Sequence, residues 1–446
     1  FRKYLGINRN TMNGSVGLDF ATQSARAILI DDSGKIIERF NTDLAQVITG
    51  LNNSRTQDPK SWLYAINFLL EKVEEATKKH SINIVGLSIT ATSGTFLLCD
   101  DEGRPVTQGV MYNDGTASSP LERAKLLAQP NTSFKHVPEF LISYLTKEKD
   151  IAADWSHALK TGFDLDKKEW KVETDLSLPK VVAPGTKLGE IAFSLPLGGT
   201  PIFAGMTDGC TGQISAGGTK VGSAVTTLGT TLVTKIISNK NISGPGFYSH
   251  LLPETTWLAG GASNLGGISL KKFNNLDEMN LLASEFGPAI RVVYPLIGKG
   301  ERFPIANSEL IEIESTGSIS SAEEFRSILE GIAFAERLSY EILENAGGPK
   351  INSLNSVGGG TKSQLWSQIR ATVMKMPVVT QENAGSDLGA AMLALAASKG
   401  GSLSENLNQI PLQAGITYEP NVSEINKLEA NYQKFLEIIR RFRKDL

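Results

Sequence analysis

Short apolar runs separated by compact polar turns dominate the start of the chain. Residues 16–30 contain two apolar strands on either side of a tight Asp/Thr/Ser turn, and a third strand follows residues 32–34, so a β-meander is predicted. Amphipathic periodicity over residues 62–77 predicts a helix. Residues 84–89 predict a buried strand that leads into the polar turn 92–95. This succession of strands and a helix is typical of an α/β protein.

Two further units of strand and turn follow. A second meander is predicted through residues 96–112, and a weaker copy of the first hairpin at residues 224–237, where Gly229, Thr230 and Thr231 separate two apolar strands. In an α/β protein such paired units suggest duplicated domains that each present a turn to the same phosphates. Two unrelated hairpins would produce the same pattern, so both interpretations stay open at this point.

The second half of the chain adds a long helix and a glycine run. Residues 322–346 have apolar positions spaced for a largely buried helix, and residues 347–349 provide its stop signal. A strand at residues 354–357 then runs into three glycines, residues 358–360, from which another helix continues through Met374. The glycine run is therefore predicted to lie between a strand and a helix.

The length of the chain predicts two domains. At 446 residues it exceeds what one hydrophobic core usually supports. We expect an N-terminal domain over residues 1–235 and a C-terminal domain over residues 236–420. The last segment, 421–446, contains an amphipathic helix that we expect to pack back on the first domain.

Composition excludes several classes of partner. The 44 basic and 47 acidic residues are spread along the chain and leave a formal net charge of -3, which provides no footprint for nucleic acid or an anionic membrane surface. The longest apolar stretches, such as residues 390–397, fall far short of the roughly 20 residues that span a bilayer. A small molecule is the expected partner of a soluble protein.

Cysteine and histidine usage excludes a disulfide framework and a zinc site. Only two cysteines occur, Cys99 and Cys210, which fits a reducing compartment. The four histidines lack the paired spacing of zinc ligands. The chain opens at Phe1 rather than Met, so we expect that an N-terminal segment was removed, and a lost transit peptide is one source of such a start.

The first meander carries a candidate phosphate site at its turn. Asp19 lies at a strand end and Thr22 in the following turn, where backbone N–H groups and the Thr hydroxyl can donate to phosphate oxygens and Asp19 can hold magnesium through water. An ordinary β-turn whose Asp and Thr satisfy the local backbone explains the segment equally well.

A second aspartate, Asp208, follows the apolar strand 201–204 and precedes a small-residue helix start. Ligand chemistry in α/β folds lies at the carboxyl ends of strands. Phosphoryl transfer to an alcohol needs one base near the attacking hydroxyl, and Asp208 can be that base. Taken alone, the motif favours the simpler role of a helix N-cap.

The glycine run suits a nucleotide. Missing side chains at Gly359 and Gly360 let a purine and its ribose approach the backbone, and the helix that follows favours phosphate charge at its N-terminus. Neither the Walker spacing nor GxGxxG is present. By itself the run is a weak signal.

Taken in order, these stretches resemble the FGGY carbohydrate kinases, members of the actin-like ATPase superfold, over nearly the whole chain. The meander VGLDFATQSARAILID resembles the first phosphate motif of the family, AVTTLGTTL the second, and GMTDGC the segment with the catalytic base. Further stretches follow in the order of the family: ADWSHALKTGFDLDKKEW, APGTKLGEI, GGASNLGG, GKGERFPI, LEGIAFAERLSYEIL, SVGGGTKSQLWSQIRATVMKMPV and GSDLGAAMLALAASKG.

The resemblance implies a fold, a reaction and a set of site residues. The fold would be two actin-like, ribonuclease H-like α/β domains that face each other across a catalytic cleft. Asp208 would take the proton of the sugar hydroxyl, and Asp19 and Asp208 would hold Mg²⁺ and touch the sugar. The remaining residues would bind ATP: Thr22, Gly229, Thr230 and Thr231 at the phosphates, and Gly359, Gly360, Ser363 and Trp366 around the adenosine. Trp366 can equally be a core aromatic.

The sugar side departs from the family pattern. Family members carry a Trp and an Arg around the Asp at the end of the second meander, whereas this chain reads MYNDGT over residues 111–116 and has no Arg there. Residues 118–138 are shorter than the helical insertion of the family. This compact form resembles the short xylulose-kinase-like branch of plants and cyanobacteria, which implies a ketopentose, D-ribulose or D-xylulose, as substrate. Ser93 would then bind the sugar, or else act only as a turn residue.

Three functional hypotheses remain on this basis. An ATP-dependent ketopentose kinase leads. A nucleotide-binding protein with vestigial kinase activity and a regulatory role is the alternative, motivated by the reduced sugar wall. An actin-like or chaperone-type ATPase shares the superfold, but the stretch from Gly298 to Pro304 argues against it. We expect a monomer or homodimer, in the plastid if the source is a plant and otherwise in the cytoplasm.

Overall fold

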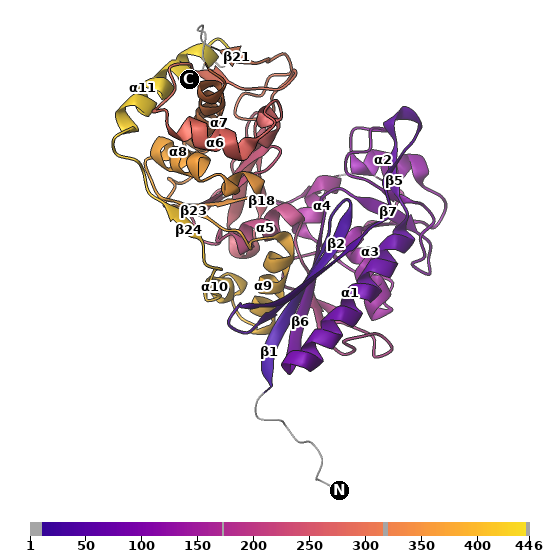
Figure 1. Cartoon of the computed structure of the whole chain (residues 1–446). Coiled ribbons are helices and arrows are strands. Elements are labelled where there is room, and N and C mark those ends of the chain that lie inside the picture. The colour runs from indigo at the N-terminus through magenta and orange to yellow at the C-terminus, as the bar shows by residue number, and fades with distance from the viewer. Residues whose placement is uncertain (1–10, 172–173, 315–319, 443–446) are drawn as a thin grey trace. The chain divides into compact units, whose positions relative to one another are not determined.

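The computed structural model describes residues 11–171, 174–314 and 320–442, which divide into two compact units (Figure 1). Unit 1 comprises residues 1–215, 251–254 and 385–412, and unit 2 comprises residues 216–250, 255–384 and 413–446. The start of the chain at Phe1 and the end of the predicted C-terminal helix, 443–446, lie outside the described residues.

Unit 1 is built on a six-stranded sheet in the order β14-β15-β6-β1-β2-β3. Strands β1, β2 and β3 form the predicted meander of antiparallel neighbours, and β6 and β15 run parallel to β1. The strands are β1 Met12–Phe20, β2 Ser24–Asp31, β3 Ile36–Asp43, β6 Ile82–Ala91, β14 Lys187–Glu190 and β15 Pro201–Phe203.

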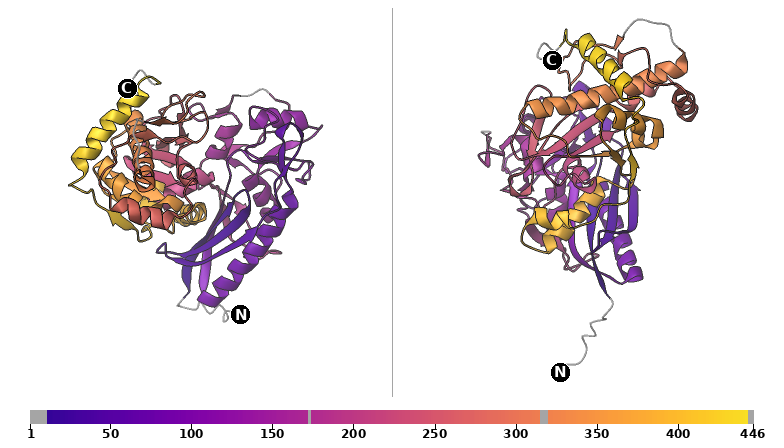
Figure 2. Two further views of the ribbon diagram at one scale, coloured as in Figure 1. Left: turned by 45° about the horizontal axis from the view of Figure 1, so that its top comes forward. Right: turned by 90° about the vertical axis from the view of Figure 1, so that its left-hand side faces the viewer.

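A different helix covers each face of β1. Alternate side chains of a strand point to opposite faces, and Val16 and Leu18 join the apolar core that includes α1 (Pro59–His80), which lies along the strands in Figures 1 and 2. On the other face, the Ser15 hydroxyl donates to the Ala391 carbonyl at 2.7 Å. A Cβ on Gly17 would lie 1.9 Å from the Asp387 carbonyl, so its small size permits the close approach of α9 (Ser386–Ser398).

A second, five-stranded sheet of unit 1 has the order β4-β5-β8-β7-β9. Its strands β7 and β8 are the apolar parts of the second predicted meander. The strands are β4 Ile48–Thr49, β5 Arg55–Gln57, β7 Phe96–Cys99, β8 Gly109–Val110 and β9 Ser133–His136. The other helices of unit 1 are α2 Pro120–Leu127, α3 Val137–Thr146, α4 Trp155–Thr161, α5 Asp208–Ser215 and α10 Leu403–Asn408. Two short strand pairs complete the unit, β10 Ala153–Asp154 with β13 Val181–Val182, and β11 Phe163–Asp164 with β12 Glu169–Trp170.

Unit 2 is built on a seven-stranded sheet in the order β18-β19-β17-β16-β22-β23-β24. Its apolar core runs from β16 and β17 through the long helix α7, which is buried along most of its length. The strands are β16 Ser223–Leu228, β17 Leu232–Ser238, β18 Phe247–Leu251, β19 Trp257–Ser263, β22 Ser353–Val357, β23 Val378–Thr380 and β24 Ile416–Tyr418, with a separate pair β20 Val293–Tyr294 and β21 Ile313–Glu314. The helices are α6 Leu276–Ser284, α7 Ser321–Asn345, α8 Gln364–Met374 and α11 Ile425–Ile439.

Both main sheets share one strand order. In unit 1 the meander lies in the order β3-β2-β1, and β6 and β15 continue parallel to β1. In unit 2 the corresponding strands are β19-β17-β16, and β22 and β23 continue parallel to β16. The hypothesis of two duplicated α/β domains with the ribonuclease H-like strand order is therefore confirmed over that of two unrelated hairpins.

The expected domain limits need correction. A boundary after residue 235 would cut through β17, which pairs with β16 and β19 along its length, and unit 2 instead begins at residue 216. The C-terminal helix α11 does not return to unit 1. Its Phe435 stacks on Tyr294 with ring centroids 5.7 Å apart, inside the core of unit 2. The segment that does return is 385–412, which contains α9.

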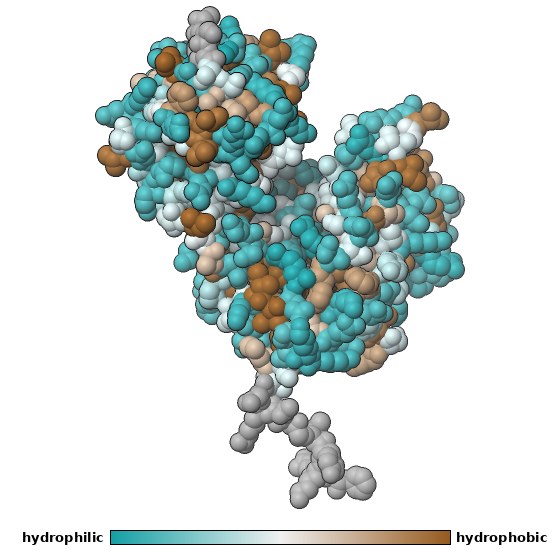
Figure 3. Space-filling model, viewed as in Figure 1, coloured by the Kyte–Doolittle hydropathy of each residue, from teal (hydrophilic) through white to brown (hydrophobic). Residues whose placement is uncertain are grey.

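The surface of each unit is mostly hydrophilic on the face shown in Figure 3. Exposed hydrophobic side chains form small separate groups there among hydrophilic ones. Among the helices in the described part of the chain, none is both long enough and apolar enough to cross a membrane. Cys99 and Cys210 are both buried and form no disulfide.

Candidate active site

Three parallel strands of unit 1 bring the predicted sugar-side residues to one sheet edge. Asp19 lies near the carboxyl end of β1 and is in register with Thr90 on β6. The Thr90 hydroxyl donates to the Met206 carbonyl at 2.7 Å, which ties the end of β6 to the segment that precedes Asp208. Because the carboxyl ends of parallel strands share an edge, this is where α/β folds place ligand chemistry.

Asp19 is a buried carboxylate in an unusual environment. Its side chain is only 1% exposed, and one oxygen accepts from Arg26 on β2 at 2.5 Å. Burial raises the pKa of Asp19 to about 7, opposed by Arg26 and reinforced by the negative charges of Asp208 and Asp387. Its Oδ1 atom has no hydrogen-bond partner in the structure. A buried acceptor without a partner is costly, so its persistence points to a ligand at this position.

Asp208 lies in the first turn of α5 but does not hold the N-cap position. Thr207 does, because its carbonyl accepts the first helical bond from the Thr211 N–H at 3.0 Å. The Asp208 carboxylate accepts from the N–H of its neighbour Gly209 at 2.7 Å. Its side chain is half-buried. The simpler interpretation of Asp208 as the helix N-cap therefore loses its support.

Two polar turns flank the carboxylates. Ser93, which follows β6, has a buried hydroxyl with no hydrogen-bond partner in the structure. Thr22 lies in the turn between β1 and β2, which is closed by the Ala21 N–H donating to the Ser24 carbonyl at 3.0 Å. The Thr22 carbonyl accepts from the amide of Gln57, a buried side chain, at 2.9 Å. The Thr22 turn is thus held rigid, and Ser93 retains hydrogen-bonding capacity.

One acidic residue of this edge was not predicted as a site residue. Asp387, at the start of α9, is 1% exposed and pairs with Arg39 at 2.9 Å. Its charge is among those that raise the pKa of Asp19. The stretch GSDLGAAMLALAASKG was noted as family-like, but its sequence position gave no sign that it would lie beside residue 19.

The carboxylates of this edge fit a magnesium ion that is carried by a nucleotide. Mg²⁺ typically takes one or two protein carboxylates and keeps several waters and phosphate oxygens. The unpartnered Oδ1 of Asp19, with Asp208 and Asp387 near enough to shift its pKa, offers such a donor. In the described residues no group of three or more His, Cys, Asp or Glu side chains is arranged as a complete metal cage.

Unit 2 contains a cavity of about 580 Å³ that collects most of the predicted nucleotide residues. Six of them line it: Gly229, Thr230, Gly359, Gly360, Ser363 and Trp366. Thr231, predicted at the phosphates, is not in the lining. The sequence did not predict the other lining residues. Lys362 lies beside Ser363, and the rest come from three further segments: Gly267, Ile268, Leu270, Lys271, Leu276, Asp277, Asn280, Phe325 and Leu329.

The two glycine turns of this cavity touch because β16 and β22 are parallel neighbours. Gly358 has a φ of +98°, and a Cβ there would lie 2.6 Å from the Leu228 carbonyl, so only glycine suits this position. A Cβ on Gly359 would meet no atom within 4 Å. Gly359 therefore leaves its backbone open to a ligand.

Ser363 and Trp366 have structural partners as well. The Ser363 hydroxyl accepts from the Trp366 backbone N–H at 3.1 Å as the N-cap of α8, and donates to the side-chain Oδ1 of Asn280 at 2.5 Å. Trp366 is 1% exposed and belongs to the core of unit 2, with part of its ring at the cavity wall. The core interpretation of Trp366 is therefore supported, and its indole N–H finds no acceptor in the structure.

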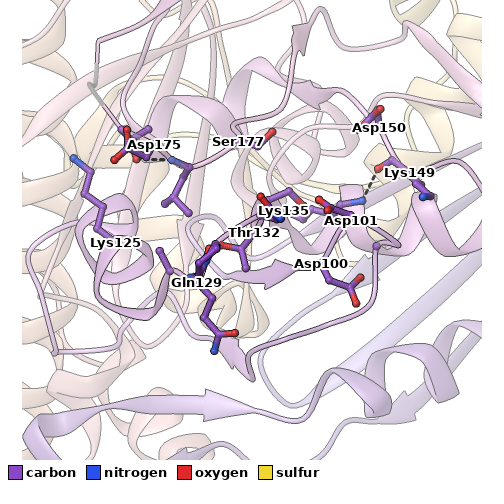
Figure 4. A pocket seen from close by; sticks show the side chains of 17 residues that line it. Asp100, Asp101, Lys125, Gln129, Thr132, Lys135, Lys149, Asp150, Asp175 and Ser177 are labelled. Atoms are coloured by element: carbon purple, nitrogen blue, oxygen red, sulfur yellow. Dashed lines mark hydrogen bonds between the residues drawn. The ribbon is translucent and has the colours of Figure 1, made fainter.

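A larger cavity of about 1070 Å³ in unit 1 contains none of the predicted site residues (Figure 4). Its walls carry charges of both signs. The buried Lys135 donates its ammonium to the Lys149 carbonyl at 2.6 Å and to the Ser143 hydroxyl at 3.3 Å. Because none of the predicted site residues lines this cavity, it is not part of the candidate site.

Comparison with known proteins matches both halves of the chain. Residues 15–149 match the FGGY family of carbohydrate kinases, N-terminal domain, and residues 224–398 match the C-terminal domain of that family. A xylulose kinase of Staphylococcus epidermidis is 24% identical, and the match covers 97% of each chain. The fold is similar to that of a xyloylose kinase from Brucella ovis, with a TM-score of 0.86 at 21% identity over 97% of this chain and 99% of that one. It is also similar to a ligand-bound xylulose kinase from Lactobacillus acidophilus, with a TM-score of 0.82 at 20% identity over 96% and 98%.

Proposed function

This chain belongs to the FGGY family of carbohydrate kinases, and from that premise we propose that it transfers the γ-phosphate of ATP to a ketopentose, D-xylulose or D-ribulose. The observation that carries the proposal is the sheet edge of unit 1, where Asp208 lies within electrostatic reach of the buried Asp19 and the unpartnered Ser93 hydroxyl follows the end of β6. When two carboxylates lie in different environments, one can act as the general base while the other binds the substrate or a metal ion.

Asp208 is the general base in this proposal. Phosphoryl transfer asks a protein mainly to position the reactants and stabilise charge, and one carboxylate accepts the proton of the attacking hydroxyl. The Asp208 side chain lies in the first turn of α5 and is half-buried, so part of it is accessible to a substrate. Asp19 and the Ser93 hydroxyl orient the sugar, since each has a buried atom in need of a partner.

The nucleotide binds in the cavity of unit 2. The adenosine lies against Gly359 and Gly360, and the phosphates lie near Gly229 and Thr230. Thr22 of unit 1 is a further phosphate donor in this assignment. Asp19 and Asp208 would hold Mg²⁺, which would supply positive charge for the phosphates when bound.

The substrate class rests on relatives and on one side chain. The relatives from Staphylococcus epidermidis and Lactobacillus acidophilus are named as xylulose kinases, which supports a ketopentose. The shortened segment at residues 118–138 and the unpartnered Ser93 hydroxyl agree with a small sugar.

A coupled ADP-release assay tests the function. Ketopentoses, aldopentoses, polyols and glycerol are offered in turn with ATP and Mg²⁺. We expect a ketopentose to accelerate ADP release most. If no sugar accelerates it while ATP still raises the Tm, the alternative of a nucleotide-binding protein with vestigial activity is favoured instead.

Ser93→Ala is expected to lower kcat/KM for the sugar by about 10- to 100-fold, with KM for ATP unchanged. The loss corresponds to one hydrogen bond between a neutral side chain and a substrate hydroxyl in a desolvated site. Initial rates at varied sugar and fixed saturating ATP measure it. Ser119→Ala, which removes an exposed hydroxyl that caps α2, is the control and should leave both constants unchanged. An unaltered sugar KM in Ser93→Ala would remove Ser93 from the site.

Gly359→Val is expected to raise KM for ATP by about tenfold or more, with little change in KM for the sugar. The new side chain would meet no protein atom within 4 Å and would project into space that we assign to the nucleotide. Varied ATP at saturating sugar measures the effect. Gly287→Val, whose Cβ also meets nothing within 4 Å but which lies outside the cavity lining, is the matched control. Equal ATP constants in both variants would contradict the assignment of the cavity.

A further inference from the structure

Three buried polar side chains gather at the start of α4, behind the loop that carries Asp208. Asp154, Ser156 and His157 are at most 3% exposed. One oxygen of Asp154 accepts from the backbone N–H of Ser156 at 2.8 Å and of His157 at 3.2 Å. The same oxygen accepts from the Ser156 hydroxyl at 2.6 Å. Asp154 thus caps α4 and also sets the orientation of the Ser156 hydroxyl.

The Ser156 hydroxyl reaches across to the site. Because the hydroxyl donates its proton to Asp154, its lone pairs remain available to accept hydrogen bonds. One of them accepts from the Thr207 backbone N–H at 2.8 Å. Thr207 is the N-cap of α5 and the residue before Asp208. A chain of three buried groups, Asp154 to Ser156 to Thr207, therefore fixes the backbone immediately before Asp208.

His157 holds this chain in place from the side. Its Nδ1 lies 2.5 Å from the second oxygen of Asp154. Burial opposes a charged imidazole, but the Asp154 carboxylate, with smaller contributions from Glu139 and Asp208, outweighs it and raises the pKa of His157 to about 8. The contribution of Asp208 indicates that the ring lies within electrostatic reach of that side chain. The Nε2 atom of His157 is buried without a partner in the structure.

If Asp154 and its neighbours had a purely structural role, capping of α4 would be sufficient to explain them. Capping requires only that Asp154 accept from backbone N–H groups. It does not require Ser156 to accept from a residue 51 positions away, nor a buried histidine paired with the capping carboxylate. These two additional contacts connect α4 to the loop of Asp208.

We propose that Asp154, Ser156 and His157 form one positioning unit for the Asp208 carboxylate. His157 fixes the Asp154 carboxylate, and Asp154 orients the Ser156 hydroxyl. Ser156 accepts from the Thr207 N–H, so that the Asp208 carboxylate is directed toward the substrate. The proposal rests on the proposed function of Asp208 as base. Small displacements of a reacting group cost large factors in rate, so the unit acts on kcat and leaves the nucleotide cavity of unit 2 untouched.

Ser156→Ala and His157→Gln test the unit in the full chain. Each is expected to lower kcat for sugar phosphorylation by about tenfold or more, with KM for ATP within about twofold of the wild type. The double variant should lose little more than either single variant, because residues that act through one element are not additive. Ser119→Ala, which removes the N-cap serine of α2 in the same unit, controls for the general loss of a cap and should keep kcat. Unchanged kcat in Ser156→Ala, or losses in the double variant equal to the product of the single ones, would overturn the proposal.

Hydrogen exchange provides a readout that does not depend on turnover. Amides of residues 205–211 should exchange faster in Ser156→Ala than in the wild type, and should be unchanged in Ser119→Ala. If the wild type phosphorylates no sugar, the proposed function fails, and faster exchange in this segment still supports the positioning unit. Identical exchange in wild type and Ser156→Ala overturns the unit, whatever the activity.

Discussion

Asp208→Asn is expected to lower kcat for sugar phosphorylation by about three orders of magnitude while leaving KM for ATP within about twofold. A positioned general base contributes on the order of 10²- to 10⁴-fold, and the amide cannot accept the proton of the hydroxyl. The substitution keeps the shape of the side chain and an acceptor for the Gly209 N–H, so the start of α5 should persist. The ADP-release assay with the preferred sugar measures kcat, and the ATP-induced rise in Tm measures nucleotide binding.

Asp101→Asn is the matched control for this variant. Asp101 is an exposed carboxylate of the same unit, so the same loss of charge should leave kcat unchanged. Turnover of Asp208→Asn at the wild-type rate would remove Asp208 as the base. A large rise in KM for ATP without a fall in kcat would instead make Asp208 a binding residue.

Asp19→Asn is expected to lower kcat by about 100-fold or more and to raise the Mg²⁺ concentration needed for half-maximal rate. The variant removes a buried negative charge that we assign to the ion and the sugar. Rates at varied Mg²⁺ and fixed ATP measure both effects. A variant with normal Mg²⁺ dependence and normal kcat would exclude Asp19 from the site.

The same variant should be more stable than the wild type at alkaline pH when no ligand is present. The pKa of Asp19 is raised from its ordinary 3.8 to about 7, so the folded state binds its proton more tightly than the unfolded state does. The stability that this group contributes is full below pH 4 and is lost as the pH rises from about 4 to about 7. Asp19→Asn removes this loss, and its Tm should exceed that of the wild type by a few degrees at pH 8 and by less at pH 5.

The measurement is a pair of thermal melts at pH 5 and pH 8 without nucleotide or Mg²⁺. Asp101→Asn serves again as the control, with no pH-dependent difference expected. A variant that is less stable than the wild type at pH 8 would mean that the ion pair with Arg26 outweighs the cost of burying the Asp19 charge.

The strand ends at which the candidate site residues lie were predictable from the sequence. The alternation around Asp19, the turn at Gly229 and the glycine run at 358–360 all lie where local patterns predict strand ends, and β1, β16 and β22 have those ends. These signals are local, since strand periodicity and turn residues act within a few positions of one another.

Contacts between residues far apart in the sequence could not be predicted from such local patterns. Asp387 lies beside Asp19 only because α9 packs on β1, and the wall of the unit 2 cavity includes Asn280 and Phe325, which no motif marked as site residues. Burial likewise supports the core role of Trp366, which the sequence left open beside a role at the adenosine.

The sequence by itself determined the family, the two meanders, the glycine turns and the identity of the two carboxylates. The tertiary structure decided that residues 385–412 belong to unit 1, that α11 stays with unit 2, and that the hydroxyl of Ser156 holds the loop before Asp208. The reason is physical. A hydrophobic face indicates that a segment will be buried, and a polar side chain indicates which hydrogen bonds it can form. Neither indicates which distant segment will pack against it.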